Sequence, residues 1–211
     1  SIRLNPHQGR AYYNLGLARE EQGNYEVAAD LYRKALTNRM GSPDVHYHLG
    51  VALEGMRDLV SAKQHFGTVL SLDASHKEAH YRLGVIAAKE RRFDDAEVHF
   101  TAAIDIDAQF ADAHYNLARL LFKQGKSDAA MREMELFKSL SAYNKEVESL
   151  ERILLYLPRD AEAHLELGHV HRKYEQHDRA LEAYRTALSI RPGFRDAQQA
   201  LTEALEVTEA L

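Results

Sequence analysis

The sequence predicts an all-α fold, an α-solenoid of stacked helical hairpins that ends in a C-terminal capping helix. Three repeating features predict it. Leucine recurs every 34 residues, at Leu15, Leu49, Leu83 and Leu117. An alanine comes thirteen residues after each leucine, at Ala28, Ala62, Ala96 and Ala130. Four residues later stands a bulky apolar residue, at Tyr32, Phe66, Phe100 and Met134. A fixed period near 34 is typical of arrays in which each unit is a pair of helices.

Each unit is expected to form two amphipathic helices, because its apolar residues recur at the spacing of one helix face. Short polar turns separate the two helices, as at residues 22–24 and 175–177. A small residue follows each repeated leucine, and small residues let two helix backbones approach closely. Since one hairpin cannot bury its apolar face alone, we expect the stability of the fold to come from stacked neighbours.

This spacing and choice of residues resemble the tetratricopeptide repeat family of helical-hairpin solenoids, and the resemblance implies a right-handed α-solenoid. The resemblance covers about four fifths of the chain, as five units at 9–42, 43–76, 77–110, 111–144 and 161–194. The family's tryptophan at the fourth position of a unit is absent. In its place stand Tyr12, His46, His80, His114 and His164.

The two ends of the chain differ from the complete units. Residues 1–8 match the close of a second helix from an earlier, truncated repeat, so we expect the chain to be a piece of a longer protein or a processed one. Residues 195–211 predict one more helix. A solenoid needs such a cap to cover its last apolar face.

The array is interrupted at 145–160, where we expect an irregular helical insertion. Around it, apolar residues alternate by four and three, at Leu136, Leu140, Tyr143, Val147, Leu150, Leu154 and Leu157. This is a heptad stripe. One interpretation is a single long helix from about residue 128 to 157, and the other is a kink near residues 141–144. The stripe must be covered, either by the chain's own last unit or by a second copy in a homodimer.

The composition excludes several classes of protein. A net charge of −5 and a pI near 6.2 argue against a general nucleic-acid binder, which normally has a basic domain. No apolar run reaches the length of a membrane span. With no cysteine, the chain has no disulfide and no thiolate chemistry. These features favour a cytoplasmic location.

By resemblance, the first helix of each unit lines a concave groove. The residues expected to face the groove are Tyr13, Asn14, Leu17, Tyr47, His48, Val51, Tyr81, Arg82, Val85, Tyr115, Asn116 and Arg119. Tyrosine combines a large rigid ring with a polar tip, which suits a binding surface. Two interpretations stay open, because the tyrosines either clamp an extended peptide or support packing between units. Charge also changes along the groove, from acidic residues in the early units to Lys89, Arg119 and Lys123 later.

The carboxylate clamp of chaperone-binding relatives is not expected here. It needs lysine and asparagine where this chain has Tyr13 and Leu17, and it needs a second lysine where Glu78 stands. Recognition of a C-terminal Glu-Glu-Val-Asp tail is therefore not expected.

The sequence contains no convincing catalytic or metal-binding motif. Twelve histidines are present, yet none belongs to a set like His-Glu-x-x-His, and we expect those at the fourth repeat position to pack as half-buried rings. A Gly-rich phosphate loop and a nucleophile elbow are also absent. We therefore expect no catalytic residue, metal or cofactor.

Together, these features predict a non-catalytic protein–protein interaction scaffold that binds an extended peptide or a segment of a partner protein in its concave groove. Two alternatives stay open. The chain is a substrate-recognition or regulatory region of a larger enzyme, such as a glycosyltransferase, or it is a self-assembling structural protein.

Overall fold

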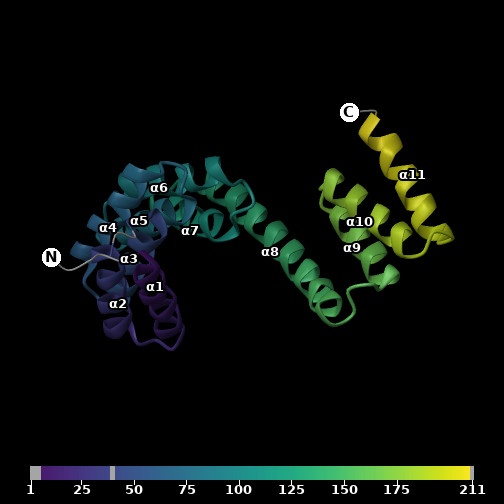
Figure 1. The fold of residues 1–211 in the computed structure, drawn as a ribbon. Helices are drawn as coiled ribbons and strands as arrows, with labels where there is room; N and C mark the ends of the chain where they lie inside the picture. The colour runs from purple at the N-terminus through teal and green to yellow at the C-terminus, as the bar shows by residue number, and fades with distance from the viewer. Residues whose placement is uncertain (1–5, 39–40, 210–211) are drawn as a thin grey trace. The chain divides into compact units, whose positions relative to one another are not determined.

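The computed structural model describes residues 6–38 and 41–209, which form eleven α-helices and no strand (Figure 1). The helices are α1 (Pro6–Glu21), α2 (Tyr25–Thr37), α3 (Pro43–Gly55), α4 (Leu59–Leu72), α5 (Lys77–Lys89), α6 (Phe93–Ile106), α7 (Ala111–Lys123), α8 (Ser127–Tyr156), α9 (Ala161–Lys173), α10 (His177–Ile190) and α11 (Arg195–Glu209). The predicted all-α solenoid of helical hairpins is confirmed. No helix in this part of the chain is long and apolar enough to cross a bilayer.

The helices pack as successive hairpins. The pairs α1 with α2, α3 with α4, α5 with α6, and α9 with α10 contact each other most extensively. In the first unit, successive hairpins pack through α2 with α3, α4 with α5, and α6 with α7. The contacts divide the chain into two compact units, residues 1–134 and 135–211, with the boundary inside α8. In the second unit, α11 packs against α10 and α9 at the end of the array.

The start of the first helix differs from the sequence assignment. α1 begins at Pro6, inside the segment 1–8 that we assigned to an earlier repeat. Proline is well tolerated at the first position of a helix, because its missing N–H would have no partner there. Residues 1–5, where we expected the close of an earlier helix, lie outside the described residues, as do residues 210–211 of the expected cap.

The turn inside every repeat has the same backbone geometry. The fifteenth residue of each repeat has a positive φ, and these residues are Gly23, Arg57, Arg91, Gly125 and Glu175. After it, a backbone N–H returns to the first helix, as from Asn24 to the carbonyl of Arg19 at 2.8 Å. This is a Schellman cap, which satisfies carbonyls left free at the helix end. The polar turns of the sequence are thus helix caps in all five repeats.

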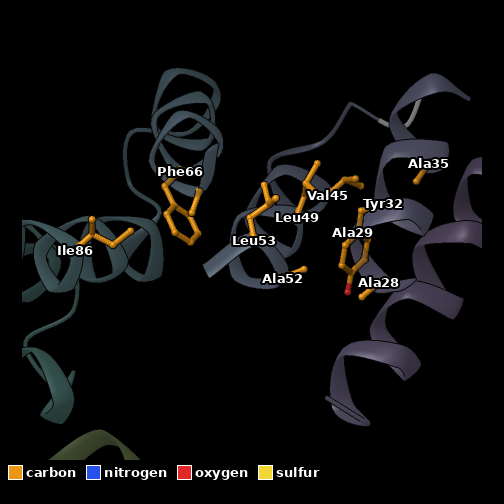
Figure 2. Close-up of a cluster of buried hydrophobic side chains, with 11 residues drawn as sticks. Ala28, Ala29, Tyr32, Ala35, Val45, Leu49, Ala52, Leu53, Phe66 and Ile86 are labelled. Atoms are coloured by element: carbon orange, nitrogen blue, oxygen red, sulfur yellow. The ribbon is translucent and has the colours of Figure 1, made fainter. Parts of the chain in front are cut away.

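The contact between the two helices of a hairpin is built from one glycine and one ring. Phe66 of α4 is fully buried, and a Cβ atom placed on Gly50 of α3 would lie only 2.6 Å from its ring. Equivalent pairs recur in three other repeats. Phe66 belongs to a cluster that also contains Tyr32 and Leu49 and extends over the first repeats (Figure 2). The repeated small and large residues therefore set how closely the helices approach.

The interruption of the array is one continuous helix. α8 spans 30 residues and includes 145–156, so of the two interpretations it matches the single long helix from about residue 128 rather than a kink near 141–144. No glycine or proline lies within it, and a kink usually needs one of them. A short loop at 157–160 then leads into α9.

Candidate peptide-binding groove

First helices of successive repeats approach each other at two places in the first unit. α1 contacts α3 and α5 contacts α7, whereas no comparable contact joins α2 to α4 or α4 to α6 within the described residues. Helices that approach one another across successive hairpins lie on the inner side of the curve. The side chains that the sequence places in the groove therefore come from α1, α3, α5 and α7.

The groove tyrosines pack at the junctions between repeats, since His76 and Phe110 are the last residues of their repeats and directly precede α5 and α7. The ring of Tyr47 stacks on His76 with centroids 4.9 Å apart, and the ring of Tyr81 lies 5.1 Å from that of Phe110. Tyr13 meets His48 of the next repeat edge to face at 5.7 Å. All three rings are only half-buried. Packing between repeats thus accounts for part of each ring and leaves the rest accessible.

The fourth tyrosine is held differently. The guanidinium of Arg119, one helical turn later on α7, lies 5.4 Å from the centroid of the Tyr115 ring. A cation over an aromatic face is attracted by the ring quadrupole. Arg119 is itself exposed, as is Asn14 at the other end of the groove. The apolar groove residues Leu17, Val51 and Val85 are half-buried.

Two carboxylates link successive repeats across the groove wall. Glu20 lies 3.3 Å from Nδ1 of His48 and accepts a hydrogen bond from the hydroxyl of Tyr32 at 2.8 Å. Glu54 accepts from Arg82 at 3.3 Å and from Lys89 at 3.0 Å. Burial, together with the hydrogen bond and charge of Glu20, raises the pKa of Tyr32. Glu20 and Glu54 are therefore satisfied by partners within the protein itself.

A cavity of about 280 Å³ opens between α5 and α7. It is lined by Val85, Ala88, Lys89, Phe100, Asn116, Arg119, Leu120 and Lys123. Phe100 and Leu120 are buried and give it an apolar floor, while three cationic side chains surround it. Within the part of the chain that the structure describes, neither Arg119 nor Lys123 forms an ion pair. Positive charge is therefore not neutralised at this point in the groove.

The chain's own last repeat contacts the middle of the heptad stripe. Tyr143 is 4% exposed, accepts a hydrogen bond from Arg179 at 2.9 Å and lies 3.1 Å from Nδ1 of His171. Its four partly buried neighbours on the stripe are Leu140, Val147, Leu150 and Leu154. The two ends, Leu136 and Leu157, are exposed. The last repeat therefore covers the stripe at Tyr143, and the other stripe residues are partly buried or exposed. A homodimer through the stripe stays a prediction.

Sequence reasoning missed a set of histidine pairs that connect the two helices of a repeat. The interacting atoms are Nδ1 of His46 and His65 at 3.1 Å, Nδ1 of His80 and His99 at 3.1 Å, and Nδ1 of His114 and a carboxylate oxygen of Glu133 at 2.7 Å. Each pair spans nineteen residues and recurs after 34, which is a signal that the sequence does carry. Among the described residues, no three His, Asp or Glu side chains are placed to hold a metal ion.

The histidine pairs predict a loss of stability in mild acid. Burial lowers the pKa of His46, His65 and His99 below the ordinary value of 6.5. For His65 and His99, the partner histidine lowers the pKa further. Below about pH 6.5 the unfolded chain therefore binds more protons than the folded chain, and stability falls with falling pH. We expect the melting temperature to drop by several degrees between about pH 7.5 and pH 5.5.

Thermal unfolding followed by circular dichroism at matched ionic strength measures this drop. In the double variant His65→Gln/His99→Gln, whose amides can still bond to the partner histidines, we expect a smaller drop. An equal drop in both proteins would assign the acid sensitivity to other groups.

Comparisons with known proteins agree with this architecture. Three family models, each described as tetratricopeptide repeat, match residues 1–43 with 47–109, residues 87–136 and residues 161–194. One of them alone covers half of the chain. A search of curated protein sequences found no match.

Several solved structures share the fold at low sequence identity. YrrB, "a TPR protein with an unusual peptide-binding site", is 20% identical, with 90% of this chain and 89% of that chain covered and a TM-score of 0.54. MamA 41-end from Desulfovibrio magneticus RS-1 is 20% identical over 89% of this chain and 97% of its own, with a TM-score of 0.58. The first TPR of Spaghetti (RPAP3), bound to the HSP90 peptide SRMEEVD, is 16% identical over 59% of this chain and 99% of its own, with a TM-score of 0.55. From the repeated hairpins and the family models, we conclude that the chain belongs to the tetratricopeptide repeat family.

Proposed function

We propose that this chain is a non-catalytic interaction scaffold that binds an extended segment of a partner protein along α1, α3, α5 and α7. The observation that carries the proposal is the cavity between α5 and α7, where half-buried apolar residues and un-neutralised cations occur together. Binding surfaces combine apolar contact area with a few placed polar groups in this way. That YrrB has a peptide-binding site and that the Spaghetti domain holds a peptide supports the proposal by analogy.

The apolar residues at the ninth position of the repeats offer a direct test. Val51 and Val85 are half-buried on α3 and α5, so a glutamate at either position can extend into the groove. Val60 and Val98 on α4 and α6 are 67% and 66% exposed. The double variants Val51→Glu/Val85→Glu and Val60→Glu/Val98→Glu therefore make the same chemical change on the first and on the second helices.

The probe is a displayed library of random peptides of about twelve residues, selected on the full chain. We expect selected peptides to bind the Val51→Glu/Val85→Glu variant at least about tenfold more weakly, a loss of about 1.4 kcal/mol. Binding to the Val60→Glu/Val98→Glu variant should not change. Peptides that bind both variants like the original chain would place recognition outside the groove. Circular dichroism must show that all three proteins are equally helical.

A further inference from the structure

The cavity between α5 and α7 lies where the preceding repeats carry a carboxylate. Glu20 and Glu54 are both the twelfth residue of their repeat, and each contacts the sixth residue of the next repeat, 28 positions later. In the third repeat the twelfth residue is Ala88. Its methyl group lines the cavity together with Asn116, the sixth residue of the following repeat. The glutamate that closes two successive repeat junctions is thus missing at the third.

The positive charge at this junction remains although the carboxylate is missing. Lys89 is already bonded to Glu54 at 3.0 Å, whereas Arg119 and Lys123 have no acidic partner among the described residues. Arginine presents a planar fork that binds a carboxylate through two parallel hydrogen bonds. Asn116 donates both of its amide hydrogens within the protein, to the hydroxyl of Tyr81 and to the carbonyl of Asp112. Any anion here is therefore held by the two cations.

The cavity is also large enough to hold a side chain rather than a single bridging water molecule. A water molecule takes up about 30 Å³ in the liquid, so a space of about 280 Å³ is several times what a single bridging water needs. Its floor of Val85, Phe100 and Leu120 is apolar and suits the methylene groups of a longer side chain. The charged end of that side chain would then lie near Arg119 and Lys123.

We propose that this cavity takes an acidic side chain, glutamate or aspartate, from the partner segment bound in the groove. The inference rests on the proposed function and adds a preference for partner segments that carry an acidic side chain. The partner would supply the carboxylate that is missing because the third repeat has Ala88 in place of a glutamate. The side chain of the partner would repeat the arrangement that Glu20 and Glu54 make within the chain. The cations belong to the ninth and thirteenth positions of the repeats, so the site differs from the carboxylate clamp that the sequence lacks.

The sharpest test restores the missing carboxylate. Ala88→Glu copies the arrangement of Glu54, so it should fill the cavity and exclude the acidic side chain of a ligand. Arg119→Gln/Lys123→Gln removes the charge from two exposed residues and leaves the packing intact. Random peptides displayed without a free C-terminus are selected on the original chain and on both variants. A second library displays the same peptides with a free C-terminus.

On the original chain we expect glutamate or aspartate to be enriched at one position of the selected peptides. An acidic peptide from that selection should bind each variant about tenfold to a hundredfold more weakly, as for the loss of a charged hydrogen bond. When salt is added, the affinity of this peptide for the original chain should fall more steeply than its affinity for the Arg119→Gln/Lys123→Gln variant. Circular dichroism again serves to check that the variants fold.

The possible failures are distinguishable. Peptides selected in the groove without any acidic preference would overturn the carboxylate site and leave the proposed function intact. An acidic preference that persists in both variants would likewise overturn the carboxylate site and leave the proposed function intact. If only peptides with a free C-terminus depend on Ala88 and the two cations, the cavity binds a terminal carboxylate and the side-chain proposal is wrong. If no peptide is selected at all, both proposals fail.

Discussion

Replacing Phe66 by alanine is expected to lower the free energy of unfolding by about 3–5 kcal/mol, the usual cost of removing a buried phenylalanine. Phe66 has no exposed surface, and its ring lies against the backbone of Gly50 and beside the ring of Tyr47. Neighbouring helices cannot collapse into the space, because the closely packed hairpin holds their backbones apart. The loss is a large fraction of the total stability of an ordinary domain.

Urea denaturation followed by circular dichroism measures this loss. Val60→Ala is the matched control, since Val60 lies on the same helix but is 67% exposed, and it should change stability by less than about 0.5 kcal/mol. Equal unfolding midpoints for the two variants would show that the ring of Phe66 does not hold the hairpin together.

The second large effect concerns two glycine-to-alanine substitutions that we expect to change stability in opposite directions. Gly50→Ala places a methyl group 2.6 Å from the ring of Phe66, so the ring or the helix must move. Such overpacking costs about 1–3 kcal/mol, of which the better helix propensity of alanine offsets about 0.5–1 kcal/mol. Gly67→Ala on α4 meets no atom within 4 Å and should stabilise the protein by the propensity gain alone. Denaturation midpoints on either side of the original value are the expected result.

The fourth repeat suggests how the Gly50 variant can be rescued. There alanine and methionine, Ala118 and Met134, stand at the positions of the glycine and the ring. Methionine is unbranched and adapts to an irregular space. The double variant Gly50→Ala/Phe66→Met should therefore lose less stability than the sum of its two single changes. An additive or larger loss would mean that the two residues do not set the helix spacing together.

Most of the fold could be predicted from local sequence. A small residue and a bulky one recur at the same separation within each repeat, so one pattern defines every hairpin. The turns were also expected, although the left-handed residue is glycine only at Gly23 and Gly125 and carries a side chain in the other three. The period was sufficient because each hairpin contacts only its neighbours.

The candidate site was only partly predictable. The tyrosines and Arg119 could be proposed as groove residues from their repeat positions. The cavity depends on Ala88, and its role is visible only when Ala88 is compared with Glu20 and Glu54. The contacts of Tyr143 with His171 and Arg179 join residues about thirty positions apart across a break in the period, so no repeat register predicts them. Contacts between side chains on different helices can be identified only once the three-dimensional fold is known.

The capped turn of each repeat also limits how the length of this chain can change. One left-handed residue and one returning hydrogen bond close the turn, which leaves no spare residue to absorb an insertion. A residue added to a helix rotates every later side chain by about 100° and turns the contacting face away from its neighbour. The array can therefore grow or shrink by whole repeats but not by single residues. The sixteen additional residues before the fifth repeat are not a whole repeat; they lengthen α8, and the capped turn recurs unchanged at Glu175 in the fifth repeat.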